Sequence, residues 1–227
     1  TDQGGMEGYS LLNGEKGYQV YETENYIPMG FTLDSYITEE QYYNLDETVR
    51  GEVLLSSIVL NESQAKLYGP YIKHENNPLV NLSYDEFRQE ARDRSSSASY
   101  RFEYDHKGFT SKIYVAKDNL VLFSVPYEKG WTAFVNGKET VIEKVDVGFM
   151  AVFAEQGFNE IVFVYEVPGL KLGAIISGIS AIGLIAYILL FYYEQKYKAD
   201  DFTLMSEFLG SKETDLSETE LPPDEDL

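Results

Sequence analysis

An uninterrupted apolar stretch near the C-terminus constrains this 227-residue chain more than any other feature. From Leu172 to Tyr193 the chain runs for 22 residues without a charged side chain. A helix rises about 1.5 Å per residue, so this stretch is roughly 33 Å long and matches a hydrocarbon core of about 30 Å. The alternative is a buried helix of a soluble domain, but such helices are usually shorter and keep a polar flank. We therefore predict a single transmembrane helix within residues 169–193.

The lysines that flank the apolar stretch predict its orientation. Lys171 precedes the stretch, whereas Lys196, Lys198 and Lys212 follow it. Basic residues are in excess on the cytoplasmic side of membrane helices. We expect the C-terminus in the cytoplasm and the residues before the helix outside the cell membrane.

Small residues recur along one face of the expected helix. Gly173, Ser177 and Ala181 are spaced four apart. Such a face lets a second membrane helix approach closely. Because Gly and Ala are common in any membrane helix, the alternative is a face that simply meets lipid. The spacing marks this face as a candidate contact with other transmembrane helices.

The charge balance and the residue types exclude several classes of function. The chain has 38 acidic and 18 basic side chains, with a net charge of -20, which opposes binding to a phosphate backbone. It has no cysteine and two histidines, so thiolate chemistry is absent and little remains for a histidine metal centre. No nucleotide-binding or hydrolase motif is present. We predict no cofactor, no metal and no nucleic-acid partner.

The residues after the apolar stretch are strongly acidic. Residues 194–227 contain eleven acidic side chains and three lysines. Such a composition is typical of solvated, disordered segments. We expect a disordered acidic cytoplasmic tail there.

The residues before the apolar stretch show a strand pattern over 96–168. Alternating apolar residues predict one strand after another, and Asn136-Gly137 between two of them is a strong hairpin signal. About seven such strands indicate an antiparallel β-sandwich or jelly roll. The last strand ends at Pro168-Gly169, close to the apolar stretch. We therefore expect the sandwich to stand directly on the bilayer.

Residues 1–95 have a mixed pattern that predicts an extracytoplasmic α+β region. Thr38 followed by Gln41, and Ser83 followed by Glu86, are capping boxes that open short helices. Residues 49–60 are typical of a helix that turns into a strand. Residues 61–82 contain Gly and Pro pairs and are expected to form a long loop.

No catalytic constellation stands out, so no catalytic residue is assigned. An acid/base pair needs two carboxylates held a few ångströms apart, and the sequence singles out no such pair. Trp131 and Tyr127 are candidate glycan contacts, because both lie at an expected strand end and an exposed ring can stack on a sugar. The alternative for Trp131 is that it caps the core of the sandwich.

Several motifs occur together in an order that resembles a known family. They are Leu120 to Trp131, Val135-Asn136-Gly137-Lys138, Gly157 to Ile161 with Tyr165, and Pro168 to Gly173 before a membrane helix. Upstream, Tyr18 to Glu22 and Asn25 to Phe31 fit the same pattern. This order resembles the C-terminal part of the bacterial YfhO family over most of residues 18–193.

The resemblance implies a function that the residues alone do not. The YfhO family resembles GT-C-type glycosyltransferases, multi-pass membrane proteins implicated in decorating cell-wall polymers such as lipoteichoic acid from a polyprenyl-phosphate-sugar donor. It implies that this chain is a C-terminal fragment without the catalytic loop, whose sandwich orients an acceptor glycan. A non-catalytic structural module and a single-pass surface adhesin or receptor are the alternatives.

Overall fold

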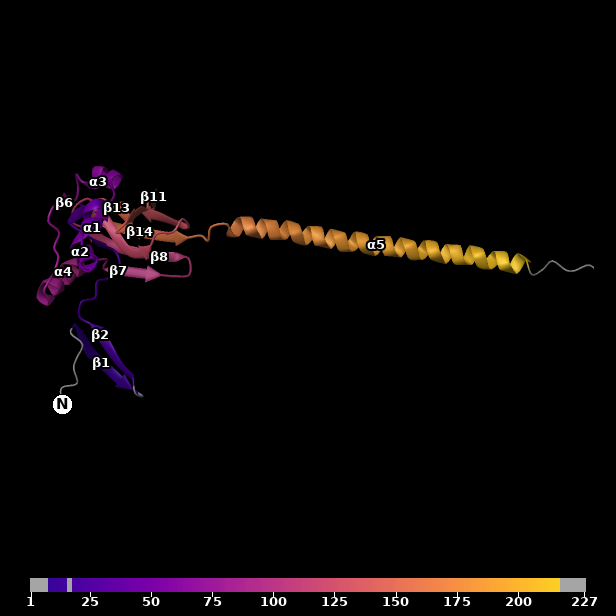
Figure 1. Ribbon diagram of the computed structural model, residues 1–227, viewed down its shortest axis with the longest axis horizontal. Helices are drawn as coiled ribbons and strands as arrows, with labels where there is room; N and C mark the ends of the chain where they lie inside the picture. The colour runs from indigo at the N-terminus through magenta and orange to yellow at the C-terminus, as the bar shows by residue number, and fades with distance from the viewer. Residues whose placement is uncertain (1–7, 16–17, 217–227) are drawn as a thin grey trace, which may run out of the picture. The chain divides into compact units, whose positions relative to one another are not determined.

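The computed structural model describes residues 8–15 and 18–216 (Figure 1). The chain divides into two compact units, Thr1–Pro168 and Gly169–Leu227. Within the described residues, the first unit contains three stacked sheets, a separate hairpin and four helices, and the second contains one long helix.

The two antiparallel sheets of the first unit form the predicted β-sandwich. The five-stranded sheet has the order β11 (Lys138–Thr140), β10 (Trp131–Val135), β14 (Gly157–Tyr165), β8 (Gly108–Val115) and β7 (Arg101–Tyr104). The four-stranded sheet has the order β12 (Glu143–Val145), β13 (Phe149–Ala154), β9 (Asn119–Pro126) and β3 (Phe31–Thr32). Phe163 and Ile113 from the first sheet pack against Phe123 from the second. This confirms the antiparallel sandwich.

The third sheet is small and parallel. Its order is β5 (Ser57–Leu60), β4 (Ser35–Thr38) and β6 (Lys73–His74), and the helices α1 (Glu39–Asn44), α2 (Arg50–Ser56) and α3 (Glu62–Tyr68) connect its strands. α4 (Tyr84–Ser96) follows it along the chain. This mixed region confirms the predicted α+β character of the N-terminal part.

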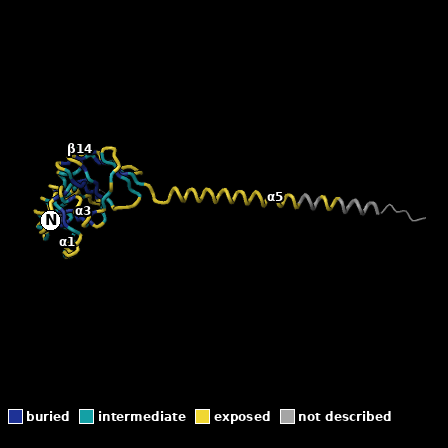
Figure 2. The backbone as a smooth tube through the Cα atoms, turned by 90° about the horizontal axis from the view of Figure 1, so that it is seen from above, coloured by how far each residue is buried: buried dark blue, intermediate teal, exposed yellow. Residues whose placement is uncertain are grey.

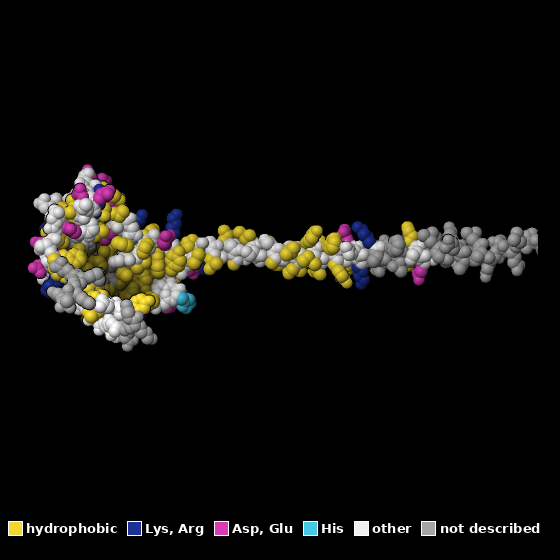
Figure 3. Space-filling view, turned by 60° about the horizontal axis from the view of Figure 1, so that its bottom comes forward, with side chains coloured by type: hydrophobic (Ala, Val, Ile, Leu, Met, Phe, Trp, Pro, Cys, Tyr) yellow, Lys and Arg dark blue, Asp and Glu magenta, His cyan; other side chains and the backbone are white. Residues whose placement is uncertain are grey.

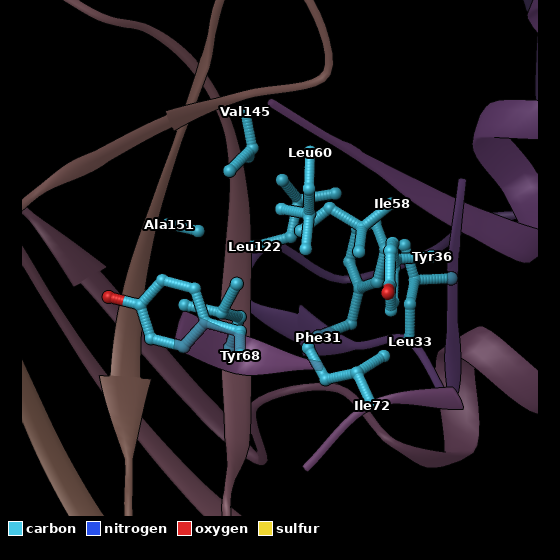
Figure 4. Close-up of a cluster of buried hydrophobic side chains, with 11 residues drawn as sticks. Phe31, Leu33, Tyr36, Ile58, Leu60, Tyr68, Ile72, Leu122, Val145 and Ala151 are labelled. Carbon is cyan, nitrogen blue, oxygen red and sulfur yellow. The ribbon is translucent and has the colours of Figure 1, made fainter. Parts of the chain in front are cut away.

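The four-stranded sheet is the middle layer, because its two faces contribute to different cores. In β9, Val121 and Phe123 belong to the core shared with the five-stranded sheet. Leu122 points the other way and packs against Ile58 and Leu60 of the parallel sheet (Figure 4). All five of these side chains are at most 2% exposed. Burial on both faces explains why β9 is a continuous apolar run. Figure 2 shows the buried segments of the first unit in dark blue.

Short-range signals in the sequence predicted several local features correctly. Asn136 and Gly137 have φ values of 53° and 78°, and they join β10 to β11 with Val135 opposite Lys138. Positive φ at both central residues is the geometry of a type I′ hairpin turn. The capping boxes of Thr38 and Ser83 both form.

The long loop expected over residues 61–82 was wrong in its first part. α3 and β6 lie there, and α3 begins with a capping box between Asn61 and Gln64. A separate hairpin of β1 (Tyr9–Glu15) and β2 (Tyr18–Thr23) also precedes the sheets.

β3, which lies before the predicted domain boundary at residue 95, pairs with β9. The four-stranded sheet therefore draws strands from both sides of that boundary.

The second unit is the helix α5 (Leu170–Leu216). Its segment Leu170–Lys198 is long and apolar enough to cross a membrane, and its side chains are exposed in this structure (Figure 3). The helix continues past the predicted span into the acidic segment. Residues 217–227, where we also expect disorder, lie outside the described residues.

Candidate functional site

The structure gives the two candidate glycan contacts different surroundings. Trp131 begins β10 and is partly buried, with its ring 5.6 Å from that of Phe109 and 4.9 Å from that of Tyr165 between centroids. Tyr127 follows β9 and is 37% exposed. Its backbone N–H donates to the carbonyl of Gly148 at 2.8 Å. Tyr127 is thus the more exposed of the two, whereas Trp131 mainly packs on the sandwich core.

Tyr127 lies in the wall of a cleft of about 450 Å³, which we call the Tyr127 cleft. Its lining combines two tyrosine rings, two carboxylates, two amides, a lysine and two aliphatic side chains: Glu39, Tyr43, Asn61, Gln64, Tyr127, Ile142, Glu143, Lys144 and Val147. A second recess shares Glu39 and Asn61 with it and adds Glu40 and Glu62. The two hollows therefore adjoin.

The parallel sheet explains why Glu39 and Asn61 meet at this cleft. Thr38 ends β4 and lies opposite Leu60, which ends β5. Each strand is followed at once by a capped helix, α1 after Thr38 and α3 after Asn61. The cleft therefore lies at the carboxyl ends of two parallel strands, the edge at which open α/β sheets usually bind ligands.

A hydrogen-bonded carboxylate fixes the opposite wall of the cleft. Glu143 accepts hydrogen bonds from Gln64 Nε2 at 2.7 Å and from the Tyr68 hydroxyl at 2.9 Å. Gln64 Nε2 also donates to the carbonyl of Lys144 at 3.1 Å. Burial, followed by the hydrogen bond and charge of Glu143, raises the pKa of Tyr68 above its ordinary value. These contacts join α3 to β12 and hold Glu143 in one position.

The turn beneath the cleft contains a buried carboxyl group. Asp146 is 5% exposed, and its Oδ1 accepts a hydrogen bond from the backbone N–H of Val59 at 2.6 Å. Burial raises the pKa of Asp146 to about 7, and the hydrogen bond from Val59 opposes that rise only in part. The next residue, Val147, lines the cleft.

The lining of the cleft suits binding better than proton transfer or metal chemistry. Exposed tyrosine rings offer an apolar face, and the surrounding carboxylates and amides offer acceptors and donors, which is the combination that a polyhydroxylated ligand needs. Among residues 8–15 and 18–216, no group of three or more acidic, His or Cys side chains is arranged to hold a metal ion.

Most of the cleft was missed by reasoning from the sequence. Tyr127 was singled out, but Tyr43, Glu143 and Val147 were not, because segments distant in the sequence bring them together. One signal was available: Asn61 followed by Gln64 is a capping box, and it would have predicted the start of α3.

The candidate contact face of the membrane helix is open in this structure. Gly173, Ser177 and Ala181 all lie on α5 and are exposed. A Cβ atom added at Gly173 would meet no other atom within 4 Å. Packing of a second helix on this face stays a prediction.

The fold and the site together describe a chain in which a helix apolar enough to span a membrane follows a folded unit with a polar cleft. A family model described as "Bacterial membrane protein YfhO" matches residues 69–177. The "Uncharacterized protein YfhO" of Bacillus subtilis (strain 168) is 30% identical over 110 residues, which are 48% of this chain. The resemblance to the YfhO family is confirmed over residues 69–177.

The matched segment is a small part of that relative, since it spans 13% of its length. It includes Tyr127, Glu143 and Asp146, whereas Glu39 and Asn61 lie before it. No solved structure matches the chain.

Proposed function

We propose that this chain is the C-terminal part of a membrane glycosyltransferase that decorates cell-wall polymers, such as lipoteichoic acid, from a polyprenyl-phosphate-sugar donor. In this proposal the first unit faces the outside and orients the acceptor glycan, while α5 crosses the bilayer and packs on other helices of the parent protein. The catalytic residues lie in another part of the parent. The resemblance to the YfhO family and the Tyr127 cleft support this assignment.

The observation that carries the binding role is the composition of the Tyr127 cleft. Tyr43 and Tyr127 are 54% and 37% exposed, and both line the same hollow as the side chains of Asn61 and Lys144. A sugar ring can stack on an exposed aromatic face while its hydroxyl groups bond to neighbouring polar side chains.

Titration of lipoteichoic acid against the full chain in detergent micelles, followed by tyrosine and tryptophan fluorescence, tests the binding role. We expect saturable binding that Tyr127→Ala weakens at least ten-fold, which corresponds to about 1.4 kcal/mol. Tyr104→Ala is the matched control, because Tyr104 is 83% exposed and lies outside the cleft. No binding by the folded wild-type chain would remove the role.

The alternative is a structural module that stabilises the parent protein without touching sugar. The packing of Trp131 against Phe109, Phe163 and Tyr165 favours it. Trp131→Ala separates the two functions in cells. Lost glycosylation at a normal protein level supports recognition, and loss of the protein itself supports the structural role.

A further inference from the structure

The turn between β12 and β13 has an unusual backbone. Asp146 and Val147 have φ values of 46° and 64°, and both are residues with a Cβ. Asp tolerates this left-handed region, but a β-branched residue there is an outlier. The turn is held by a hydrogen bond from Gly148 N to Val145 O at 2.9 Å. Such strain persists only where the surroundings fix it.

Asp146 fixes the turn against the parallel sheet. Its carboxyl Oδ1 accepts from Val59 N at 2.6 Å, and its own backbone N–H donates to Val59 O at 3.2 Å. β5 is the edge strand of its sheet, so these two bonds satisfy backbone groups that would otherwise be unpaired. An asparagine would accept the same bond without a titratable proton.

The buried carboxyl has no compensating positive charge. In the part of the chain that the structure describes, no lysine or arginine forms an ion pair with Asp146. Ionising a buried carboxyl group without a charged partner is unfavourable in free energy, so the ionised group favours conformations in which water solvates it. Ionisation of Asp146 therefore destabilises the closed turn, because the carboxylate cannot reach water without breaking its hydrogen bond with Val59 N.

The turn also contributes one residue to the wall of the Tyr127 cleft and is hydrogen-bonded to a second. Val147 lines the cleft directly, and Gly148 O accepts from Tyr127 N at 2.8 Å. A turn that leaves β5 would therefore move Val147 and release the main chain at Tyr127.

We propose that Asp146 is a proton-operated latch for the Tyr127 cleft. The neutral carboxyl keeps the turn closed on Val59, and the ionised carboxyl opens the turn and loosens the cleft walls. The role at the cleft rests on the proposed function, whereas the latch itself rests on the contacts of the turn.

Other titratable groups surround the turn, and their contributions must be separated. Neither β5 nor β13 carries a titratable side chain. The remaining elements packed against β5 and the turn carry the following titratable side chains: Tyr36 on β4; Glu39, Glu40, Tyr42 and Tyr43 on α1; Arg50 and Glu52 on α2; Glu62, Lys66 and Tyr68 on α3; Tyr127 after β9; and Glu143 and Lys144 on β12. Asp146→Asn leaves all of them in place, so the difference between wild type and this variant reports Asp146.

The sign of the pH dependence follows from the raised pKa. The closed turn binds the proton with a pKa of about 7, and a solvated carboxyl has the ordinary value of 3.8. Opening therefore becomes more favourable as pH rises from about 4 to 7 and levels off above that range. The closed state is stabilised fully at low pH and loses this stabilisation as pH approaches 7.

Amide hydrogen exchange of the full chain in detergent micelles, corrected for intrinsic exchange, measures the latch. We expect the protection of the Val59 and Tyr127 amides to fall about fifty-fold between pH 5 and pH 7 in wild type. In Asp146→Asn it should be independent of pH. Identical profiles for the two proteins would overturn the latch.

Asp105→Asn is the matched control. Asp105 also accepts backbone N–H groups in a turn, from Lys107 and Gly108, but it is exposed. The bond from Lys107 is the main reason that the pKa of Asp105 is lowered. This variant should keep the wild-type pH dependence of Val59 protection, and loss of that dependence would contradict the assignment to Asp146.

Two further measurements keep the outcomes distinct. A carboxyl carbon titration of Asp146 by NMR in wild type should give a midpoint near pH 7, and a midpoint near 4 overturns the latch even if Asp146→Asn fails to fold. Lipoteichoic acid should bind wild type more weakly at pH 8 than at pH 5, and Asp146→Asn equally at both. Absence of binding at every pH would refute the proposed function and leave the exchange result to decide the latch.

Discussion

At the β12–β13 turn beside the Tyr127 cleft, Asp146 is buried, and both Asp146 and Val147 have positive φ values. Asp146 and Val59 are 87 positions apart in the chain, so no local pattern could reveal that this carboxyl group is buried. The segment Asp146-Val147-Gly148 has the composition of an exposed turn. Its strain and its raised pKa arise only when the turn packs on β5.

Val147 is a site where a smaller residue should stabilise the protein. Val147→Gly removes the steric cost of φ at 64°, and the gain exceeds the added flexibility of the unfolded chain. We expect the free energy of unfolding to rise by roughly 1 kcal/mol. Val141→Gly is the control, since Val141 is 69% exposed and has no positive φ. Denaturant unfolding of the full chain measures both, and a loss of stability in Val147→Gly would show that the turn is not strained.

Whole elements were predictable where their signals are local. The hairpin at Asn136-Gly137 and the capping boxes at Thr38 and Ser83 depend on residues within four positions of one another. The pairing of β3 with β9 and the meeting of α3 with β12 depend on contacts across most of the unit. Periodicity specifies which face of a strand is apolar, but it does not specify the strand's neighbour.

The contact between α3 and β12 should contribute measurably to stability. Tyr68→Phe removes one of the two side-chain donors of Glu143 and leaves its carboxylate Oε1 without that hydrogen bond. We expect a loss of about 1 to 3 kcal/mol in the free energy of unfolding. Tyr71→Phe should change it by less than about 0.5 kcal/mol, because Tyr71 is 42% exposed. Equal effects of the two variants would show that the hydrogen bond from Tyr68 to Glu143 makes no net contribution to the free energy of unfolding.

At the scale of the whole molecule, the apolar helix was the strongest signal and the sequence was sufficient to find it. The family match gives the membrane location, and the lysine distribution predicts which side each end occupies. The residues of the cleft required the folded unit, since α1, α3, β12 and the loops beside them contribute to its lining.

The predicted orientation can be measured because the chain contains no cysteine. Tyr104→Cys places a single thiol in the first unit, and Lys198→Cys places one at the end of the apolar segment. In intact cells a membrane-impermeant maleimide should label Tyr104→Cys and spare Lys198→Cys. Inverted vesicles should give the reverse result, and labelling of Lys198→Cys in intact cells would refute the orientation.

The proposed role of the Tyr127 cleft in orienting an acceptor glycan can be measured in cells by the sugar content of lipoteichoic acid. The parent protein carrying Tyr127→Ala should be present at the wild-type level while its cells lose most of the sugar from this polymer. Tyr104→Ala should leave the sugar content unchanged. Full decoration by the Tyr127→Ala protein would contradict the account.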